Sequence, residues 1–351
     1  MPPRKRWSLW AMRHSNIAIF VPHKGCPQQC SFCNQRTISG TALPPSPKDV
    51  RELLTGALAG VKDRKNAEIA FFGGSFTAID RQEMVALLEA ASEFVGPEGF
   101  SGIRISTRPD AIGREVLAIL KRYGVTSIEL GAQSMDDEVL AANRRGHTAE
   151  DVRRASRLIR EAGFSLGLQM MVGLYRDTAD GAERTAEELI LLEPDTVRIY
   201  PTVILRGTRL AELYCQKEYQ PMTLSAAVEL CAGLLLKFEQ AGVRVIRLGL
   251  HASPEIEREM LAGLYHPAFR ELCESRIYRN RAEALLKELP LEKCGREITL
   301  SVNSRAVSKM IGQNRCNLLE LEKPGWKIRV RGDSSLALYE IGMEKDVRVC
   351  F

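Results

Sequence analysis

The sequence predicts an α/β protein whose larger domain is a parallel β-sheet built of strand–helix units. Short apolar runs alternate with helices, and each helix has a capping residue at one end and glycine or proline at the other. Short, nearly continuous apolar runs are typical of parallel strands. The chain has 351 residues, of which 45% are hydrophobic, so we expect about two domains with a full core in the larger one.

Six strands are expected before Pro201, and a seventh candidate follows it. The strands are predicted at residues 17–21, 68–72, 103–107, 127–130, 165–170, 196–200 and 243–248. The helices are predicted near residues 47–61, 80–96, 110–123, 136–162 with a break at Gly146, 178–192 and 224–240. The clearest start is Ser46, a capping residue followed by Pro47 and by Asp49 three positions on. Periodicity does not distinguish an open sheet from a barrel, but in either one the ligand lies beyond the carboxyl ends of the strands.

The character of the chain changes after the seventh strand. Residues 254–289 are charged and helical in pattern, and a strand (297–302), a helix (304–311), a tight turn (312–315), a helix (316–322) and a strand (327–331) follow. We therefore divide the chain into a sheet domain (1–253), a helical connector (254–289) and a small α+β domain (290–351). The whole net charge of +5 falls after residue 275, where 15 Lys and Arg face 10 Asp and Glu. Basic segments commonly meet polyanions, although an ordinary solvated surface is the alternative.

Cys26, Cys30 and Cys33 stand at CxxxCxxC spacing just after the first strand. Three thiolates on one short loop can hold an iron–sulfur cluster and leave one iron open to a substrate or cofactor. A zinc ion would need a fourth ligand, with His14 and His23 as candidates, but structural zinc sites usually draw on two pairs of ligands. Three unpaired buried thiols are the remaining alternative.

The other cysteines indicate the compartment. They are scattered singly, which is typical of core thiols and not of a disulfide framework. They are Cys215, Cys231, Cys273, Cys294, Cys316 and Cys350. No apolar stretch reaches the ~20 residues of a membrane helix, and the N-terminus lacks a clean apolar segment. We therefore expect a soluble cytoplasmic protein with no membrane partner.

The cysteine loop, with Phe32 just before its last cysteine, resembles that of the radical S-adenosylmethionine (SAM) superfamily. Five further motifs follow in the order and spacing of the radical domain of the Elongator catalytic subunit, over about 250 residues. They are FFGGSF (71–76), STRPD (106–110), ELGAQS (129–134), NRRGHT (143–148) and YPT (200–202). The resemblance implies a curved, six-unit partial (β/α) barrel that uses a [4Fe–4S] cluster and SAM.

The resemblance also implies residue roles. Cys26, Cys30 and Cys33 would bind the cluster, and Arg145 would pair with the methionine carboxylate of SAM. The other implied SAM contacts are Phe32 on the adenine, Gly73, Gly74 and Ser75 on the methionine amine, and Gln133 and Gln169 at strand ends. Ser106 stands where relatives often carry a glutamate that holds the ribose, and Tyr200 could face the substrate radical as a catalytic residue. The alternatives are an ordinary glycine turn, a solvated arginine and a tyrosine at the barrel rim.

The β–helix–turn–helix–β order of the last segment resembles a KH domain. The GxxG clamp of that family would fall at residues 312–315, where Arg315 replaces the last glycine. A basic residue at this place can still hold a phosphate. The candidate RNA contacts are Arg305, Lys309, Gly312 and Arg315, and the alternative is a packing appendage without a ligand.

These resemblances imply an enzyme that cleaves SAM reductively to a 5′-deoxyadenosyl radical and modifies RNA, either tRNA or rRNA. A low-potential donor such as flavodoxin or ferredoxin would supply the electron. Elongator catalytic subunits also carry an acetyltransferase domain, for which we find no room, so we expect methylation, thiolation or another carbon–hydrogen functionalisation. One alternative is a small-metabolite or porphyrin substrate, because parts of two motifs also resemble oxygen-independent coproporphyrinogen oxidase. The other is an RNA-binding protein with a structural or redox-sensing cluster.

Overall fold

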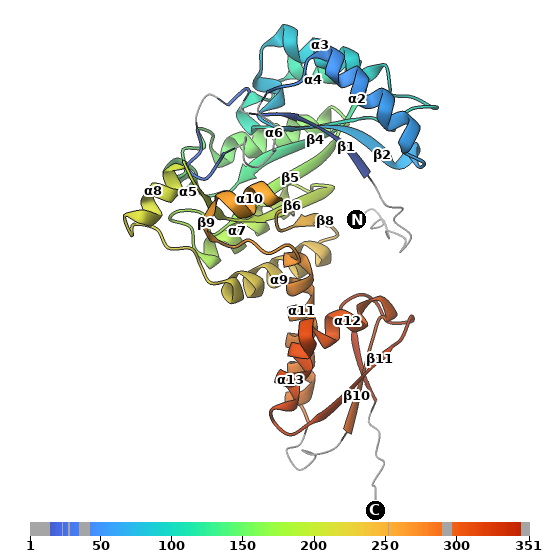
Figure 1. Ribbon diagram of the computed structural model, residues 1–351, viewed down its shortest axis with the longest axis vertical. Coiled ribbons are helices and arrows are strands. Elements are labelled where there is room, and N and C mark those ends of the chain that lie inside the picture. The colour runs from blue at the N-terminus through green and yellow to red at the C-terminus, as the bar shows by residue number, and fades with distance from the viewer. Residues whose placement is uncertain are drawn as a thin grey trace, which may run out of the picture.

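The computed structural model describes residues 15–22, 24–26, 29–34, 43–251, 253–289 and 297–344. Seven strands pair in parallel in the order β1-β2-β3-β4-β5-β6-β8 and curl into a half-barrel (Figure 1). They are β1 (Ser15–Val21), β2 (Ala67–Gly73), β3 (Ile103–Thr107), β4 (Val125–Gln133), β5 (Ser165–Val172), β6 (Thr196–Pro201) and β8 (Arg244–Leu248). The predicted α/β class and the partial barrel are therefore confirmed, with the seventh candidate as a true strand.

Helices cover the outer, convex side of this sheet (Figure 1). They are α2 (Pro47–Gly60), α3 (Arg81–Ser92), α4 (Arg114–Arg122), α6 (Ala149–Glu161), α7 (Ala179–Leu191) and α9 (Leu224–Gln240). The predicted start of α2 is confirmed, because Ser46 Oγ accepts from the Asp49 amide at 3.3 Å and Asp49 Oδ2 accepts from the Ser46 amide at 2.8 Å. The break at Gly146 is also confirmed, since it separates α5 (Asp137–Ala142) from α6.

The two faces of the sheet differ in chemistry. Side chains that point outward are apolar and fully buried under the helices, as at Ile69, Ile105 and Leu168. The alternate side chains, on the inner face, are largely polar, because successive residues of a strand point to opposite sides. The polar inner residues include Glu68, Arg104, Ser106, Glu129, Gln169 and Arg198.

Buried charges on this inner face form a continuous chain of ion pairs. Arg104 lies between Glu68, at 2.7 Å, and Glu129, at 2.9 Å. Glu129 in turn lies 2.8 Å from Arg198, whose guanidinium stands over the Phe72 ring at 5.3 Å from its centroid. The Arg198 side chain is 15% exposed and the other three are below 10%. Burial alone would lower the pKa of Arg198, but Glu129 and Tyr200 raise it above its ordinary value, so its charge is permanent.

A small antiparallel ribbon stands beside the barrel and was not predicted. Its strands are β7 (Val203–Leu205) and β9 (Met260–Gly263). Between them in the sequence lie α8 (Arg209–Cys215), α9, β8 and α10 (Pro254–Glu259). The prediction of helix throughout residues 254–289 is therefore wrong at β9. Such short strands form because a distant partner pairs with them, and local sequence patterns do not report that partner.

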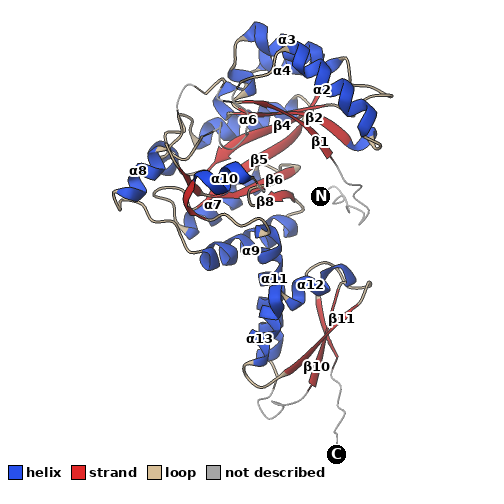
Figure 2. Cartoon of the chain, viewed as in Figure 1, coloured by secondary structure: helices blue, strands red, loops and turns tan. Residues whose placement is uncertain are grey.

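The C-terminal region follows helix α11 (Phe269–Lys287), which packs against α9 of the barrel and against the helices after it. Its elements are β10 (Glu297–Val302), α12 (Val307–Ile311), α13 (Cys316–Glu322), β11 (Lys327–Gly332) and β12 (Ile341–Glu344). Strand β10 is central, parallel to β11 and antiparallel to β12, and the helices cover one side (Figure 2). The predicted β–helix–turn–helix–β order is confirmed, and β12 is an addition. None of the described helices has the length and apolar character needed to span a bilayer.

We predict that Glu129→Gln destabilises the barrel by about 3–5 kcal/mol, because the buried charge of Arg198 would lose its partner. Urea denaturation would measure the loss as a lower midpoint at unchanged slope. Adding Arg198→Met should restore part of the stability, since it removes the unpaired charge. Glu93→Gln, which breaks an exposed pair with Arg51, is the control and should change little. A Glu129→Gln protein as stable as the wild type would contradict this account of the inner face.

Candidate functional site

The three cysteines occupy one loop at the carboxyl edge of the sheet, directly after β1. Cys30 is buried, Cys33 is half-buried and Cys26 is exposed. The Cys33 amide donates to the Cys30 carbonyl at 3.1 Å, so the chain turns tightly between these two residues. In the part of the chain that the structure describes, which leaves out His14 and His23, no three Cys, His, Asp or Glu side chains could hold a metal ion.

The glycine turn after β2 lies against this loop. The Gly74 amide donates to the Val21 carbonyl at 2.8 Å, and the Ser75 amide donates to the Lys24 carbonyl at 2.9 Å. A Cβ at Gly74 would lie only 2.1 Å from the Lys24 oxygen, which leaves no room for a side chain. Ser75 Oγ lies 3.7 Å from Cys26 Sγ. The turn therefore packs against the cysteine loop, while its contact with the methionine amine stays a prediction.

Arg145 reaches the same loop from the other side. Its Nη1 donates to Cys30 Sγ at 3.1 Å and its Nη2 donates to the Gly131 carbonyl at 2.7 Å, whereas its Nε is buried without a hydrogen-bond partner. Arg108, also buried, donates to the Arg145 carbonyl at 3.0 Å and pairs with Asp110 at 2.7 Å. Two guanidinium groups therefore lie beside the cysteine loop. The pairing of Arg145 with the carboxylate of SAM stays a prediction.

The structure brings the remaining predicted residues together in pairs along the strand ends. Gln169 Nε2 donates to Gln133 Oε1 at 3.2 Å, and Ser106 Oγ lies 3.5 Å from Glu129 Oε2. Phe32 and Tyr200 pack against one buried cluster of Val139, Met171 and Leu174. Four of these five predicted residues thus lie at or near the carboxyl ends of strands β3 to β6, and the fifth, Phe32, belongs to the cysteine loop. Their roles toward SAM and substrate stay predictions.

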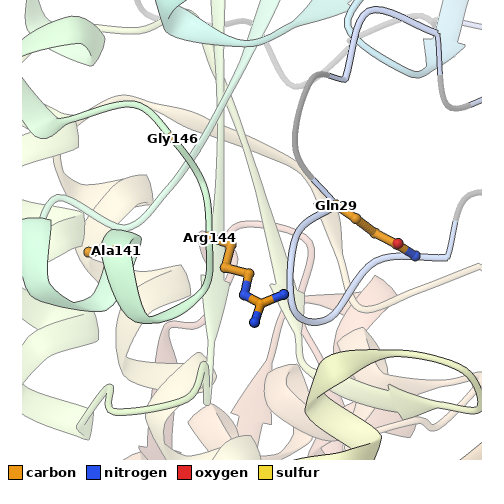
Figure 3. A pocket seen from close by; sticks show the side chains of 4 residues that line it. All are labelled: Gln29, Ala141, Arg144 and Gly146. Carbon is orange, nitrogen blue, oxygen red and sulfur yellow. The ribbon is translucent and has the colours of Figure 1, made fainter.

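Two residues without a predicted role also belong to the site. Arg108 and Asn143 both lie inside quoted motifs, but only the folded contacts show that each supports the cysteine loop. Next to Asn143, Arg144 is exposed and adopts a left-handed backbone conformation with φ 54°. Its side chain points into a hollow of about 440 Å³ that Gln29, Ala141 and Gly146 also line (Figure 3). The hollow opens directly beside the cysteine loop.

The predicted RNA-contacting residues lie around α12. Arg305 and Arg315 are exposed, and Arg315 has a left-handed φ of 62° at the end of the tight turn. Gly312 has a φ of 78°, and a Cβ there would lie 2.7 Å from Cys316 Sγ, so glycine is required. Lys309 differs from the arginines because its ammonium group pairs with the buried carboxylate of Glu274 on α11. The contact of these four residues with RNA stays a prediction.

Comparison with known proteins identifies the family. The Radical SAM superfamily profile matches residues 20–189, and that of the Radical_SAM C-terminal domain matches residues 194–279. The chain belongs to the radical SAM superfamily. It is 37% identical over 182 residues to Elongator complex protein 3 of Homo sapiens, covering 50% of this chain and 32% of that protein. It is 32% identical over 129 residues to the tRNA uridine(34) acetyltransferase of Methanocaldococcus jannaschii, covering 36% and 24%.

Solved structures agree on the fold. The archaeal Elp3 of Methanocaldococcus infernus superposes with a TM-score of 0.62 at 19% identity, covering 77% of this chain and 64% of that one. Coproporphyrinogen III oxidase of Escherichia coli superposes with a TM-score of 0.50 at 16% identity, covering 78% and 75%. At such identities the likeness concerns the fold alone. The chain spans only about a quarter to a third of the Elongator and acetyltransferase relatives that it matches, at 24% and 32% of their lengths.

Radical SAM proteins use a [4Fe–4S] cluster and SAM, and this radical SAM chain has a donor set that fits the cluster. Three thiols share one loop, and Cys30 already accepts a hydrogen bond from a guanidinium, as a thiolate ligand would. A four-iron cluster takes its cysteines on different iron atoms, so its ligands need not converge as they do around one ion. The buried, unpartnered Nε of Arg145 beside the loop is consistent with a site that gains a polar ligand.

We predict that Gly74→Ala lowers stability by about 1–3 kcal/mol, because the new methyl group would overlap the Lys24 carbonyl. The same variant should incorporate less iron on reconstitution, since the cysteine loop must move. Gly56→Ala in α2, where a Cβ meets nothing within 4 Å, is the matched control. That control should gain about 0.4–1 kcal/mol, through a less flexible unfolded chain. Equal stability and iron content in both variants would contradict the packing role of Gly74.

We predict that His147 makes the protein less stable in mild acid. Burial, followed by the charge of Arg145, lowers the pKa of His147 to about 4 from 6.5. Its Nε2 lies 3.2 Å from the Ala132 carbonyl, and its Nδ1 is buried without a partner, so a second proton would have no acceptor. Between these pKa values the unfolded chain binds a proton that the folded chain does not. Stability should therefore fall as the pH drops from 6.5 to 4, by at most about 3 kcal/mol.

Urea denaturation at pH 7 and pH 5 would measure this loss. His147→Gln keeps a polar contact with Ala132 but does not titrate, so its stability should fall less between the two pH values. Carboxylates that titrate in the same range act on both proteins and cancel in the difference. An equal pH dependence of both proteins would contradict the assignment to His147.

Proposed function

We propose that this protein is a radical SAM enzyme that functionalises a carbon–hydrogen bond of an RNA, either a tRNA or an rRNA. The observation that carries the proposal is the cysteine loop with Arg145 against Cys30, in a chain similar over half its length to Elongator complex protein 3. When bound and supplied with one electron, the cluster and SAM would provide a 5′-deoxyadenosyl radical for hydrogen abstraction from the substrate, with methionine as the leaving group. One relative is named for its action on uridine 34 of tRNA, which supports RNA as the substrate class.

The chain's own residues would bind and orient these groups. Cys26, Cys30 and Cys33 would ligate the cluster, and Arg145, in the interior beside them, is suited to a carboxylate because guanidinium groups bind carboxylates through two parallel hydrogen bonds. Gln133 and Gln169 would offer amide groups to the nucleoside of SAM, and Phe32 with Tyr200 would exclude water from the inner side of the loop. Tyr200 is the candidate hydrogen donor to a substrate radical.

The C-terminal region would hold the RNA. Arg305 and Arg315 are exposed on the helix–turn–helix, and Gly312, Asn314 and Arg315 in the turn between the helices have positive φ. In KH domains a turn at this place lets the backbone approach the nucleotides. The electron would come from a low-potential protein such as flavodoxin or ferredoxin. The predicted cytoplasmic location fits such a donor and stays a prediction.

Anaerobic reconstitution with iron and sulfide, followed by dithionite and SAM, tests the chemistry. The wild type should release 5′-deoxyadenosine, and Cys30→Ser should release none because it removes a cluster ligand. Cys215→Ser, which changes an exposed cysteine on α8, is the matched control and should behave like the wild type. A cluster that forms but yields no 5′-deoxyadenosine would favour a structural or redox-sensing role.

Charge reversal tests the RNA part. The double variant Arg305→Glu/Arg315→Glu should bind tRNA more weakly. Its affinity should also depend less steeply on salt, with the slope of log affinity against log salt smaller in magnitude by about 1–2. Arg114→Glu/Arg157→Glu on the outer helices makes the same charge change on exposed residues and should leave the slope unchanged. Nucleoside profiles of tRNA and rRNA, with and without the gene, would then identify the modification. Unchanged profiles with active SAM cleavage would point to a small metabolite or a porphyrin.

A further inference from the structure

We propose that Asn143 is a positioning residue that holds the cysteine loop in its cluster-binding conformation before any metal arrives. Asn143 lies at the end of α5, its side chain is fully buried with 0% exposure, and no role toward the cluster follows from its residue type. Its contacts reach the cysteine loop and the loop after β5 at once. The structure therefore assigns it to the support of the site.

All the polar groups of the Asn143 side chain have partners. Its Oδ1 accepts from Ser31 Oγ at 2.7 Å, and its Nδ2 donates to the carbonyls of Val139 at 2.8 Å and Tyr175 at 2.9 Å. Because two carbonyls surround Nδ2, the amide cannot turn over without facing oxygen to oxygen. The side chain is consequently fixed in one orientation, with its oxygen directed at the cysteine loop.

Ser31, the partner, is the residue directly after Cys30. It is fully buried and is held at three atoms: its amide donates to the Asn143 carbonyl at 3.1 Å, its hydroxyl to Asn143 Oδ1, and its carbonyl accepts from the Leu210 amide at 2.7 Å. Two of these three bonds come from Asn143. The position of Cys30 therefore depends on Asn143 through one peptide unit.

The segment that carries Asn143 makes a second contact with the cysteine loop. Arg145, two residues after Asn143, donates to the sulfur of Cys30 at 3.1 Å, and Arg108 holds the Arg145 carbonyl. Asn143 does cap α5 through Val139, which an asparagine at a helix end commonly does. Capping alone, however, does not require the bonds to Ser31 and Tyr175, which join three segments far apart in the sequence. A binding loop ordered in this way loses less conformational entropy when the cluster forms.

Thiol labelling of the iron-free protein tests the proposal without any enzyme assay. Iodoacetamide labelling, followed by mass spectrometry of each cysteine, should modify Cys26 quickly and the buried Cys30 slowly. Asn143→Ala keeps the backbone bond to the Ser31 amide but loses the three side-chain hydrogen bonds to Ser31, Val139 and Tyr175. It should raise the rate at Cys30 by about tenfold, since the loop would open more easily without them. Ser31→Ala removes only one of the bonds and should give a smaller rise. The double variant should label no faster than Asn143→Ala, because both changes break the same contact.

Ile159→Val in α6 is the matched control. It removes one methyl group from the core, at a cost of about 0.5–1.5 kcal/mol, and touches nothing in the loop. Its Cys30 should label as slowly as that of the wild type. If Asn143→Ala fails to fold, Ser31→Ala remains the deciding variant. A Cys30 rate that is unchanged in Ser31→Ala and Asn143→Ala, or raised equally in Ile159→Val, would overturn the proposal and would leave the proposed function untouched.

Discussion

The parallel pairing of the barrel strands is the constraint on which the site depends. Because all seven strands run in one direction, every loop that follows a strand leaves at the same edge of the sheet. The register then sets which residues meet, since Val21 stands opposite Gly73 and Met171 stands opposite Tyr200. The cysteine loop and the glycine turn follow paired strands directly, so their contact is fixed by backbone hydrogen bonds and needs no metal.

The inner face of the barrel adds a second constraint. A polar lining is needed to bind a charged cofactor, but each buried charge must have a partner or the fold loses stability. Glu129 meets this requirement by standing between Arg104 and Arg198, and Ser106 and Tyr200 lie at the edges of the same network. The network thus forms a rigid wall beside the site and leaves the half-buried polar groups nearer the edge accessible to ligands.

Much of this arrangement could be predicted from the sequence, because it is encoded locally. Apolar runs, capping residues and the cysteine spacing are properties of neighbouring residues, and the strands and α2 form where they indicate. Features that depend on distant partners could not be predicted in this way. Strand β9 forms because β7 pairs with it. Lys309, predicted to contact RNA, instead forms an ion pair with Glu274 on another helix. The contacts of Asn143 likewise come from loops far away in the sequence, so its residue type and motif give no sign of them.

Two arginines and a histidine set the charge beside the cysteine loop. Arg108 and Arg145 hold positive charge beside the thiols at any physiological pH, because arginine does not deprotonate in proteins. His147 follows Arg145 by two residues in the same turn. Burial, together with the charge of that arginine, lowers the pKa of His147 to about 4. It is therefore neutral wherever the protein would work. Cations near a cluster and hydrogen bonds to its sulfurs shift its reduction potential. The two arginines and the neutral histidine therefore keep the same charges near pH 7, so this side of the cysteine loop stays positively charged.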